Sequence, residues 1–152
     1  MNVDLSAYHS HLQISRRAKE RYIFDPVRKA YFLVQPEELV RQSWIQYLHR
    51  AKGIALSSLA VEKQFKLFGG MKRFDLLLYH RGKPIMLFEF KSFKTQLTDA
   101  ACRQAAAYNF HLKVPYILLS NGLQHRLFNI DLIKEEVHEL TDWPENITAN
   151  NS

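Results

Sequence analysis

Residues 73–91 read Arg73-Phe74-Asp75-Leu76-Leu77-Leu78-Tyr79-His80-Arg81-Gly82-Lys83-Pro84-Ile85-Met86-Leu87-Phe88-Glu89-Phe90-Lys91. Two apolar runs flank a polar turn that contains Gly82, and this pattern predicts two consecutive antiparallel strands. Each run carries one acid, Asp75 in the first and Glu89 in the second. Acids are almost never buried in strands unless they are paired or bound to metal. These two carboxylates are therefore the first candidates for a functional site.

The segments on either side of this hairpin predict further strands and two helices. Pro36, Glu37 and Glu38 suit the first turn of a helix, which we expect to begin at residue 36, and residues 59–68 alternate as in a strand. Thr98 is a good N-cap for a second helix over 98–112. Strands are expected over 114–119 and 124–130. The core order is thus α-β-β-β-α-β, which predicts an α/β (α+β) sheet with helices packed on it.

The chain is long enough for one domain, which we divide into three parts. Its 152 residues leave little room for a second domain. We expect an N-terminal extension with a short β-hairpin (1–35), a core (36–130) and an acidic C-terminal tail (131–152) that frays at its end.

Residues 1–130 carry 20 Lys and Arg against 9 Asp and Glu, whereas the tail carries one lysine against six acids. A basic body suits a phosphate backbone, although a solvated surface can be equally basic.

Several classes of protein are excluded by the composition. There is no apolar run of about 18 residues, so no membrane span is expected, and residues 1–11 contain no signal-peptide core. The only cysteine is Cys102, so neither a disulfide framework nor a cysteine zinc site can form. We expect Cys102 to be a packed or half-exposed thiol rather than a nucleophile and the compartment to be the reducing cytoplasm.

Asp75 and Glu89, on adjacent strands, could hold one cation between them. Mg²⁺ prefers hard oxygen ligands and keeps several waters, so two carboxylates, water and a substrate phosphate would complete a site. Lys91 lies two residues after Glu89 and therefore on the same strand face, where it could orient the attacking water or stabilise charge on the phosphate. In the structural alternative, Arg73 and Lys91 neutralise the two acids as salt bridges. Acids within apolar strands favour the functional interpretation.

The spacing of the acids and the lysine resembles the PD-(D/E)xK pattern of restriction-endonuclease-like nucleases: Asp75 is followed by thirteen residues and then by Glu89-Phe90-Lys91. More specifically, the chain resembles the N-terminal nuclease domain of type I restriction enzyme R subunits and its short stand-alone relatives. The segments that carry the resemblance span residues 36–122: Pro36 to Gln42, Lys72 to Asp75, Lys83 to Lys91, Gln104 with Tyr108-Asn109, and Ser120-Asn121-Gly122. The resemblance implies a restriction-endonuclease-like mixed β-sheet flanked by helices, with a nuclease-like core over 36–130. It also implies Mg²⁺-dependent hydrolysis of DNA phosphodiester bonds, with Mn²⁺ as a substitute.

The resemblance also implies further site residues. Gln104 and Tyr108 match a Gln-x-x-x-Tyr motif beside the site and lie one helical turn apart, so the expected catalytic set is Asp75, Glu89, Lys91, Gln104 and Tyr108. Glu38 matches a first-helix acid that often adds to the metal shell, so the expected ligands are Asp75, Glu89 and Glu38. Two alternatives stay open: Gln104 and Tyr108 could be a satisfied polar pair between helix and sheet, and Glu38 could be a partner of the helix dipole. Glu62 ranks below Glu38 as a further carboxylate.

The chain departs from the family pattern at two positions and lacks a motor motif. Phe74 stands where the general pattern has Pro, and Phe90 stands where a small residue is common. No Gly-x-x-x-x-Gly-Lys-Ser/Thr phosphate loop occurs, so we expect a motor or specificity protein to act in trans. The implied partners are DNA, such a protein and a second copy in a homodimer, with no membrane. The alternative function is a nucleic-acid-binding or assembly module that is inactive without a partner. The Asp75, Glu89 and Lys91 set disfavours a purely structural protein.

Overall fold

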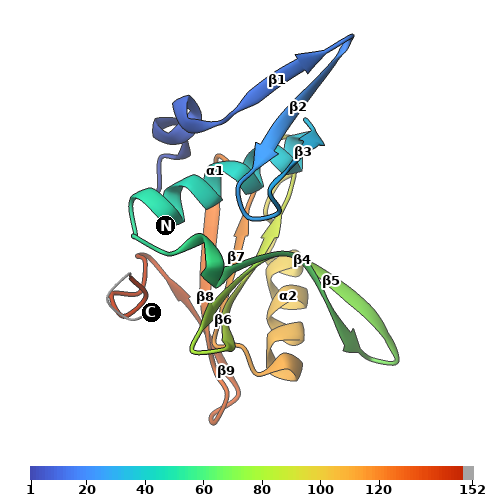
Figure 1. The fold of residues 1–152 in the computed structure, drawn as a ribbon. Coiled ribbons are helices and arrows are strands. Elements are labelled where there is room, and N and C mark those ends of the chain that lie inside the picture. The colour runs from blue at the N-terminus through green and yellow to red at the C-terminus, as the bar shows by residue number, and fades with distance from the viewer. Residues whose placement is uncertain (149–152) are drawn as a thin grey trace.

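The structure is a computed structural model that describes residues 1–148. It contains two α-helices, two short 3-10 helices and nine strands in this part of the chain (Figure 1). In chain order these are η1 (Leu5–His11), β1 (Ile14–Arg17), β2 (Glu20–Asp25), β3 (Ala30–Leu33), α1 (Pro36–Arg50), η2 (Leu56–Ser58), β4 (Leu59–Leu67), β5 (Gly70–His80), β6 (Lys83–Phe90), α2 (Asp99–Leu112), β7 (Tyr116–Ser120), β8 (His125–Asp131) and β9 (Glu136–Leu140).

A six-stranded mixed sheet in the order β4-β5-β6-β7-β8-β9 forms the centre of the fold. Strands β4, β5 and β6 form an antiparallel meander whose turns contain Gly69 and Gly82, both at φ +76°, a left-handed conformation that glycine adopts without steric cost. Strands β6 and β7 are parallel, and α2 makes the crossover that a parallel pair requires. The mixed sheet and the order α-β-β-β-α-β confirm the predicted fold class.

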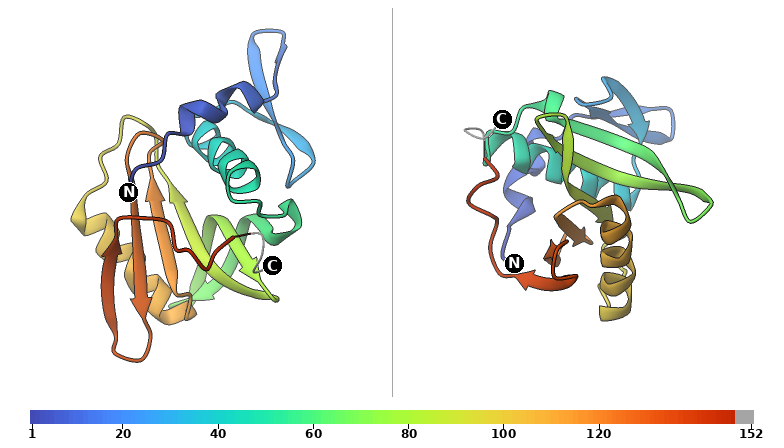
Figure 2. Two further views of the ribbon diagram at one scale, coloured as in Figure 1. Left: turned by 90° about the vertical axis from the view of Figure 1, so that its left-hand side faces the viewer. Right: turned by 90° about the horizontal axis from the view of Figure 1, so that it is seen from below.

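The two helices pack on opposite faces of this sheet (Figure 2). Trp44, Ile45 and Leu48 of α1 pack with Leu76 and Phe88 in one core. On the other face, three small side chains of α2, Cys102, Ala105 and Ala106, pack with strand residues that include Leu77, Leu87 and Leu119. Cys102 is buried, as expected. No helix among the described residues is long and apolar enough to cross a membrane.

The buried face of α2 includes one polar residue. Its buried residues are Cys102, Ala105, Ala106 and Asn109. Asn109 holds the helix to the sheet because its Nδ2 donates to the carbonyls of Val114 (3.1 Å) and Tyr116 (2.9 Å). A polar side chain thus occupies a core position that a hydrophobic pattern does not identify.

The N-terminal residues form a second, three-stranded antiparallel sheet in the order β1-β2-β3. The short β-hairpin expected within residues 1–35 corresponds to β2 and β3, with Ile23 opposite Phe32. Strand β1 and helix η1 were not predicted, because residues 1–20 lack a clear periodic pattern. Leu5 of η1 joins the α1-side core, so the N-terminal residues pack against the main sheet.

The acidic C-terminal region contains a strand that its sequence does not predict. Strand β9 pairs with β8, with Ile130 opposite Val137. Its residues are nearly all exposed, so it lacks the apolar pattern by which a strand is recognised. Ile147 then returns to the α1-side core. The expected fraying falls in part on residues 149–152, which lie outside the described residues.

Candidate active site

Asp75 lies on β5 at the point where the β5–β6 pairing ends. The last paired residues are Leu76 and Phe88, and just beyond them Asp75 Oδ2 accepts a hydrogen bond of 2.7 Å from the Phe90 N–H. Burial raises the pKa of Asp75, although the Phe90 N–H and the Arg41 guanidinium act to lower it. The ionised carboxylate is therefore disfavoured where it stands and would be stabilised by a nearby cation.

Glu89 lies on the neighbouring strand β6, and its negative charge contributes to the raised pKa of Asp75. Its side chain is only 14% exposed, and Oε1 lies 3.5 Å from Lys72 Nζ. Oε1 is buried, yet it has no hydrogen-bond partner within the described part of the chain. A buried carboxylate oxygen without a hydrogen bond is costly, so this atom has the capacity to bind a further positive group.

Lys91 follows directly after β6. Its N–H donates to the Ser120 carbonyl at 2.9 Å, which continues the pairing of Phe90 with Ser120 between β6 and β7. The side chain is exposed, and its charge acts to lower the pKa of Asp75. The ammonium group therefore influences the Asp75 carboxylate while it stays open to solvent.

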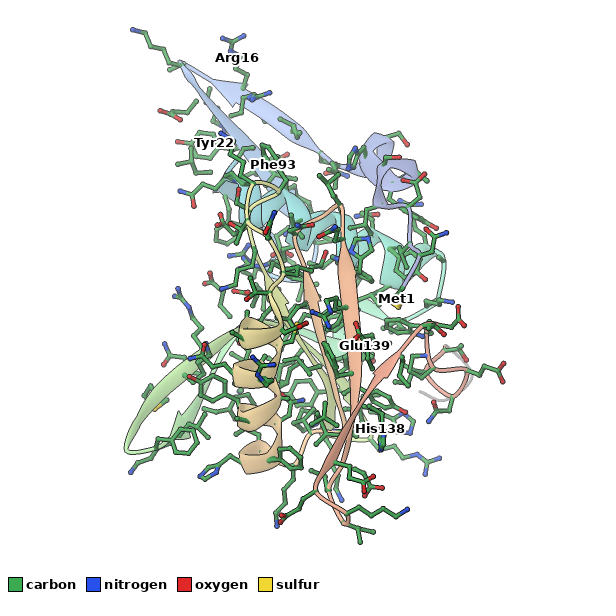
Figure 3. The ribbon with its side chains drawn as sticks, turned by 180° about the vertical axis from the view of Figure 1, so that it is seen from behind. Met1, Arg16, Tyr22, Phe93, His138 and Glu139 are labelled. Atoms are coloured by element: carbon green, nitrogen blue, oxygen red, sulfur yellow. The ribbon has the colours of Figure 1, made fainter. Side chains whose placement is uncertain are left out.

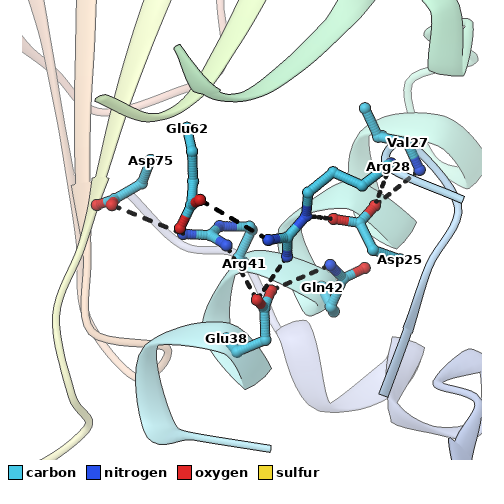
Figure 4. Close-up of polar contacts among 8 residues, drawn as sticks. All are labelled: Asp25, Val27, Arg28, Glu38, Arg41, Gln42, Glu62 and Asp75. Carbon is cyan, nitrogen blue, oxygen red and sulfur yellow. Dashed lines mark hydrogen bonds and ion pairs between the residues drawn. The ribbon is translucent and has the colours of Figure 1, made fainter. Parts of the chain in front are cut away.

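Arg41 of α1 faces three carboxylates at once (Figure 4). Its Nη1 lies 3.0 Å from Glu38 Oε1, and its Nη2 lies 3.5 Å from Glu62 Oε1 and 3.8 Å from Asp75 Oδ1. Glu38 and Arg41 meet because they are three residues apart on one helix face. Through these contacts Arg41 connects α1 with both β4 and β5.

Glu62 interrupts the pairing of β4 with β5 opposite this site. Val61 pairs with Leu76 and Lys63 pairs with Phe74, whereas Glu62 between them has φ +55°. A left-handed conformation is uncommon for a residue other than glycine, and such conformations gather at functional sites. Glu62 thereby supplies a half-exposed carboxylate, 37% accessible, next to Arg41.

Arg28 brings the N-terminal sheet into the same network. From the turn between β2 and β3, its Nε donates to Asp25 Oδ2 and its Nη2 to Glu38 Oε1, each at 2.5 Å. Burial acts to lower the pKa of Arg28, but the hydrogen bonds to Asp25 and Glu38 outweigh burial and raise it. Asp25 is fully buried, so this charged link is shielded from solvent.

Glu38 uses both of its carboxylate oxygens in this network. Oε1 accepts from Arg28 and Arg41, and Oε2 accepts from Gln42 Nε2 at 3.2 Å. In this arrangement Glu38 anchors two guanidinium groups, a role that neither the metal-ligand expectation nor the helix-dipole alternative included. Its place in a metal shell stays a prediction.

Tyr108 and Gln104 differ in their surroundings. The Tyr108 ring lies 4.9 Å from Lys72 Nζ, and Lys72 also faces Glu89, so Tyr108 is connected to the Glu89 side of the site. Gln104 is exposed on α2. That exposure argues against a satisfied polar pair at the helix–sheet interface, while the catalytic role of both residues stays a prediction.

The structural alternative expected Arg73 and Lys91 to form salt bridges with Asp75 and Glu89, but other cations form the ion pairs with these two acids. Arg73 is exposed, and the groups that face Asp75 and Glu89 are Arg41 and Lys72, respectively. The spacing of Glu38 and Arg41 could have indicated their pair from sequence. Arg28 could not have been found in this way, because it reaches the site only through the tertiary packing of the N-terminal sheet.

The donor set agrees with a hard divalent cation held by few protein ligands. No group of three or more His, Cys, Asp or Glu side chains within residues 1–148 is arranged to hold a metal ion. Mg²⁺, however, is usually bound through one or two carboxylates, with waters and substrate oxygens completing its shell. Asp75 is 34% exposed, and the buried Oε1 of Glu89 accepts no hydrogen bond within the described part of the chain, so both carboxylates fit that requirement.

Comparison with known proteins places the chain in a family. A search of curated proteins found no match. The family described as the type I restriction enzyme R protein N terminus matches residues 36–144, which include α1, the six-stranded sheet, α2 and every residue of the expected site. This match extends over most of the chain and agrees with the mixed sheet. The chain therefore belongs to the family of the type I restriction enzyme R protein N terminus.

Proposed function

We propose that this domain is a nuclease that hydrolyses DNA phosphodiester bonds with the help of Mg²⁺. The observation that carries the proposal is a pair of carboxylates, Asp75 on β5 and Glu89 on β6, just beyond the point where the pairing of these two strands ends. Burial and the charge of Glu89 raise the pKa of Asp75, and Glu89 Oε1 is buried without a hydrogen bond in the described structure. A cation placed between them would stabilise the ionised Asp75 and would give Glu89 Oε1 a further partner.

Each residue of the site has a separate role in the proposal. Asp75 and Glu89 hold the cation, and a bound Mg²⁺ would polarise the phosphate and lower the pKa of water. Lys91, exposed to the substrate side, orients the attacking water and offsets the charge that develops on the phosphate. Tyr108 and Gln104 position the nucleic acid along α2. Mn²⁺ substitutes because carboxylate and water ligands suit both ions.

Arg41 and Glu62 complete the proposed site as positioning residues. Arg41 contacts Asp75 only at 3.8 Å and is held by Glu38 at 3.0 Å, so Asp75 is oriented without being fully neutralised. The family and the basic body favour DNA as the substrate. Other subunits of a type I restriction system are the proposed partners, and a motor among them would act in trans.

A plasmid-nicking assay tests the proposal. Wild-type protein should nick supercoiled plasmid in Mg²⁺ or Mn²⁺ and not in EDTA. Asp75→Asn should abolish nicking, and Lys91→Gln should lower its rate by roughly 10²–10³-fold, the loss typical of removing one transition-state donor. Glu135→Gln and Lys134→Gln make the same chemical changes in the turn between β8 and β9 and should leave the rate unchanged.

A second candidate function is a binding or assembly module without cleavage. It is favoured by the Arg41 contact, because a guanidinium beside Asp75 can take over part of the neutralisation that a metal would provide. In that case the wild type would bind DNA without nicking it in either metal, and Asp75→Asn would bind as well as the wild type. Nicking that is lost in Asp75→Asn but kept in Glu135→Gln would exclude this candidate.

A further inference from the structure

The hairpin of β1 and β2 extends away from the rest of the molecule (Figure 1). We call this hairpin, residues 14–25, the basic ribbon. Around its tip it carries four cations, Arg16, Arg17, Lys19 and Arg21, against one acid, Glu20. It lies outside residues 36–144, to which the family match is confined. The family assignment therefore does not account for its charge.

Two of these arginines stand directly opposite each other. Arg16 pairs with Arg21 in the β1–β2 register, and both side chains are exposed. Like charges directly opposite in a sheet destabilise the strand pair. Of the ion pairs within residues 1–148, none involves Arg16 or Arg21. A bound anion between them would remove the repulsion.

Strand alternation places the two arginines on the face of the ribbon that leads to the candidate site. Arg21, Ile23 and Asp25 share one face of β2, and Arg16 lies opposite Arg21 on that face. Asp25 belongs to the ion-pair network that continues through Arg28 and Glu38 to Arg41 and Asp75 (Figure 4). At about 3.3 Å per strand residue, Arg21 is about 13 Å from Asp25. That span is about four base-pair steps at roughly 3.4 Å each.

The ribbon is linked to the site through its inner face, and its outer face is packed within the N-terminal sheet. On the inner face, Arg28 lies 3.3 Å from the centre of the Phe32 ring of β3 and donates to Glu38 of α1. On the outer face, Arg17 packs over the rings of Tyr22 (5.9 Å) and Tyr31 (5.2 Å). Figure 3 shows Arg16 on the extended hairpin, far from His138 at the other end of the molecule.

We propose that the basic ribbon is a DNA-binding arm, in which Arg16 and Arg21 contact phosphates of the duplex that lies in the Asp75–Glu89 site. The inference rests on the proposed function for its substrate. A two-stranded ribbon is slim enough to enter or follow a DNA groove, and a phosphate between the two guanidinium groups relieves their repulsion. Because contacts to phosphates carry no sequence information, the arm strengthens binding to any duplex and sets its direction across the site.

The test is the salt dependence of duplex binding by the full chain in EDTA, where no cleavage occurs. The double variant Arg16→Gln/Arg21→Gln should bind a 30-base-pair duplex at least about tenfold more weakly at 50 mM salt. Its plot of log affinity against log salt should be shallower by about 1.8, the value for two lost phosphate contacts. The variant Arg16→Lys/Arg21→Lys keeps both charges and should retain the wild-type slope.

A matched control removes two cations at the opposite end of the molecule. Arg81→Gln/Lys83→Gln makes the same charge change in the exposed turn between β5 and β6 and should leave the slope within about 0.3 of the wild type. A slope change as large in this control as in the ribbon variant would overturn the proposal, because the effect would then be one of net charge. A ribbon variant that binds DNA as the wild type does but no longer binds vesicles of anionic lipid would overturn it as well.

Failure of this inference and failure of the proposed function can be told apart. If the wild type nicks plasmid and the ribbon variant binds and nicks equally well, the arm is refuted and the nuclease stands. If the wild type does not nick in Mn²⁺ but binds DNA with a slope that depends on Arg16 and Arg21, the arm stands and the nuclease is refuted. Thermal melts of Arg81→Gln/Lys83→Gln should match the wild type, because both side chains are exposed. Arg16→Gln/Arg21→Gln should melt at the wild-type temperature or slightly above it, because the repulsion between two exposed side chains is removed.

Discussion

Arg41 offsets part of the effect of burial on the Asp75 carboxylate in the metal-free protein. Its guanidinium is shared among Glu38, Glu62 and Asp75, and Asp75 is the most distant of the three at 3.8 Å. Burial keeps the pKa of Asp75 raised in spite of this contact. The ionised Asp75 therefore opposes folding, and Arg41 retains two other carboxylates if Asp75 is neutralised.

Asp75→Asn should accordingly leave the metal-free fold as stable as the wild type, or slightly more stable. The asparagine carbonyl can still accept from the Phe90 N–H, and burial no longer disfavours a charge. We expect a change of less than about 1 kcal/mol in the free energy of unfolding, measured by urea denaturation at pH 7 in EDTA. Mn²⁺ should stabilise the wild type but not the variant, because a ligand stabilises only the state that binds it.

Arg41→Gln removes the other partner of the Arg41–Asp75 contact and should have the opposite effect on stability. Its loss leaves Glu38, Glu62 and Asp75 without their common partner, and removing one member of a buried ion pair costs about 3–5 kcal/mol. A metal-free Asp75→Asn that is destabilised as much as Arg41→Gln would mean that Asp75 is primarily a structural ion-pair partner. That result would also weaken the metal-site proposal.

Among individual residues, the sequence indicated the two candidate acids, Asp75 and Glu89, but not the cations that form ion pairs with them. Asp75 and Glu89 were identified because a carboxylate inside an apolar strand is rare and requires compensation. Arg28 and Lys72 were missed because a cation near the surface is common and carries no local signal of its own. Which cation meets which acid is decided by strand twist and by the packing of the N-terminal sheet, and neither can be derived from spacing along the chain.

Helices and strands whose apolar residues recur at a regular spacing could be predicted from the sequence. A strand defined only by its backbone hydrogen bonds to a neighbouring strand could not. The presence and order of α1, α2 and β4 to β8 follow from periodicity, caps and glycine turns. Strand β9 has no buried residue and is defined by its hydrogen bonds to β8. After β9 the chain leads Ile147 into the core beside α1, where its carbonyl accepts a hydrogen bond of 2.6 Å from Trp143 Nε1.

Ile147→Ala should therefore destabilise the protein although it lies in the acidic C-terminal region. Truncating a buried isoleucine costs about 2–5 kcal/mol, and Ile147 is 6% exposed. Val137→Ala on β9 is the matched control, since Val137 is 41% exposed and should change the free energy of unfolding by less than about 0.5 kcal/mol. Equal urea midpoints for the two variants would show that the C-terminal segment contributes nothing to the core.

In the molecule as a whole, one buried histidine helps to hold the N-terminal residues against the main sheet. His125 of β8 is buried, its Nε2 lies 2.9 Å from the Val3 carbonyl and its Nδ1 lies 2.8 Å from Ser120 Oγ. A carbonyl can only accept, so Nε2 carries the proton and Nδ1 accepts from the Ser120 hydroxyl. The Trp44 ring of α1 lies edge-on to the imidazole at 5.1 Å, so this contact joins three parts of the fold.

The stability of the whole fold should consequently depend on pH through His125. Burial lowers the pKa of His125 below 6.5, assisted by the charge of the N-terminal amine and opposed by the Val3 carbonyl. Above pH 6.5 the imidazole is neutral in both states, and its stabilising contribution is complete. Below that value the unfolded chain takes up the proton first, so the free energy of unfolding falls, by at most about 1.4 kcal/mol per pH unit for one proton. Urea denaturation between pH 7 and pH 5 should show this fall in the wild type and in the exposed-site control His11→Gln. In His125→Gln, which is less stable at pH 7, the fall should be shallower, and a slope equal to that of the wild type would show that other groups cause it.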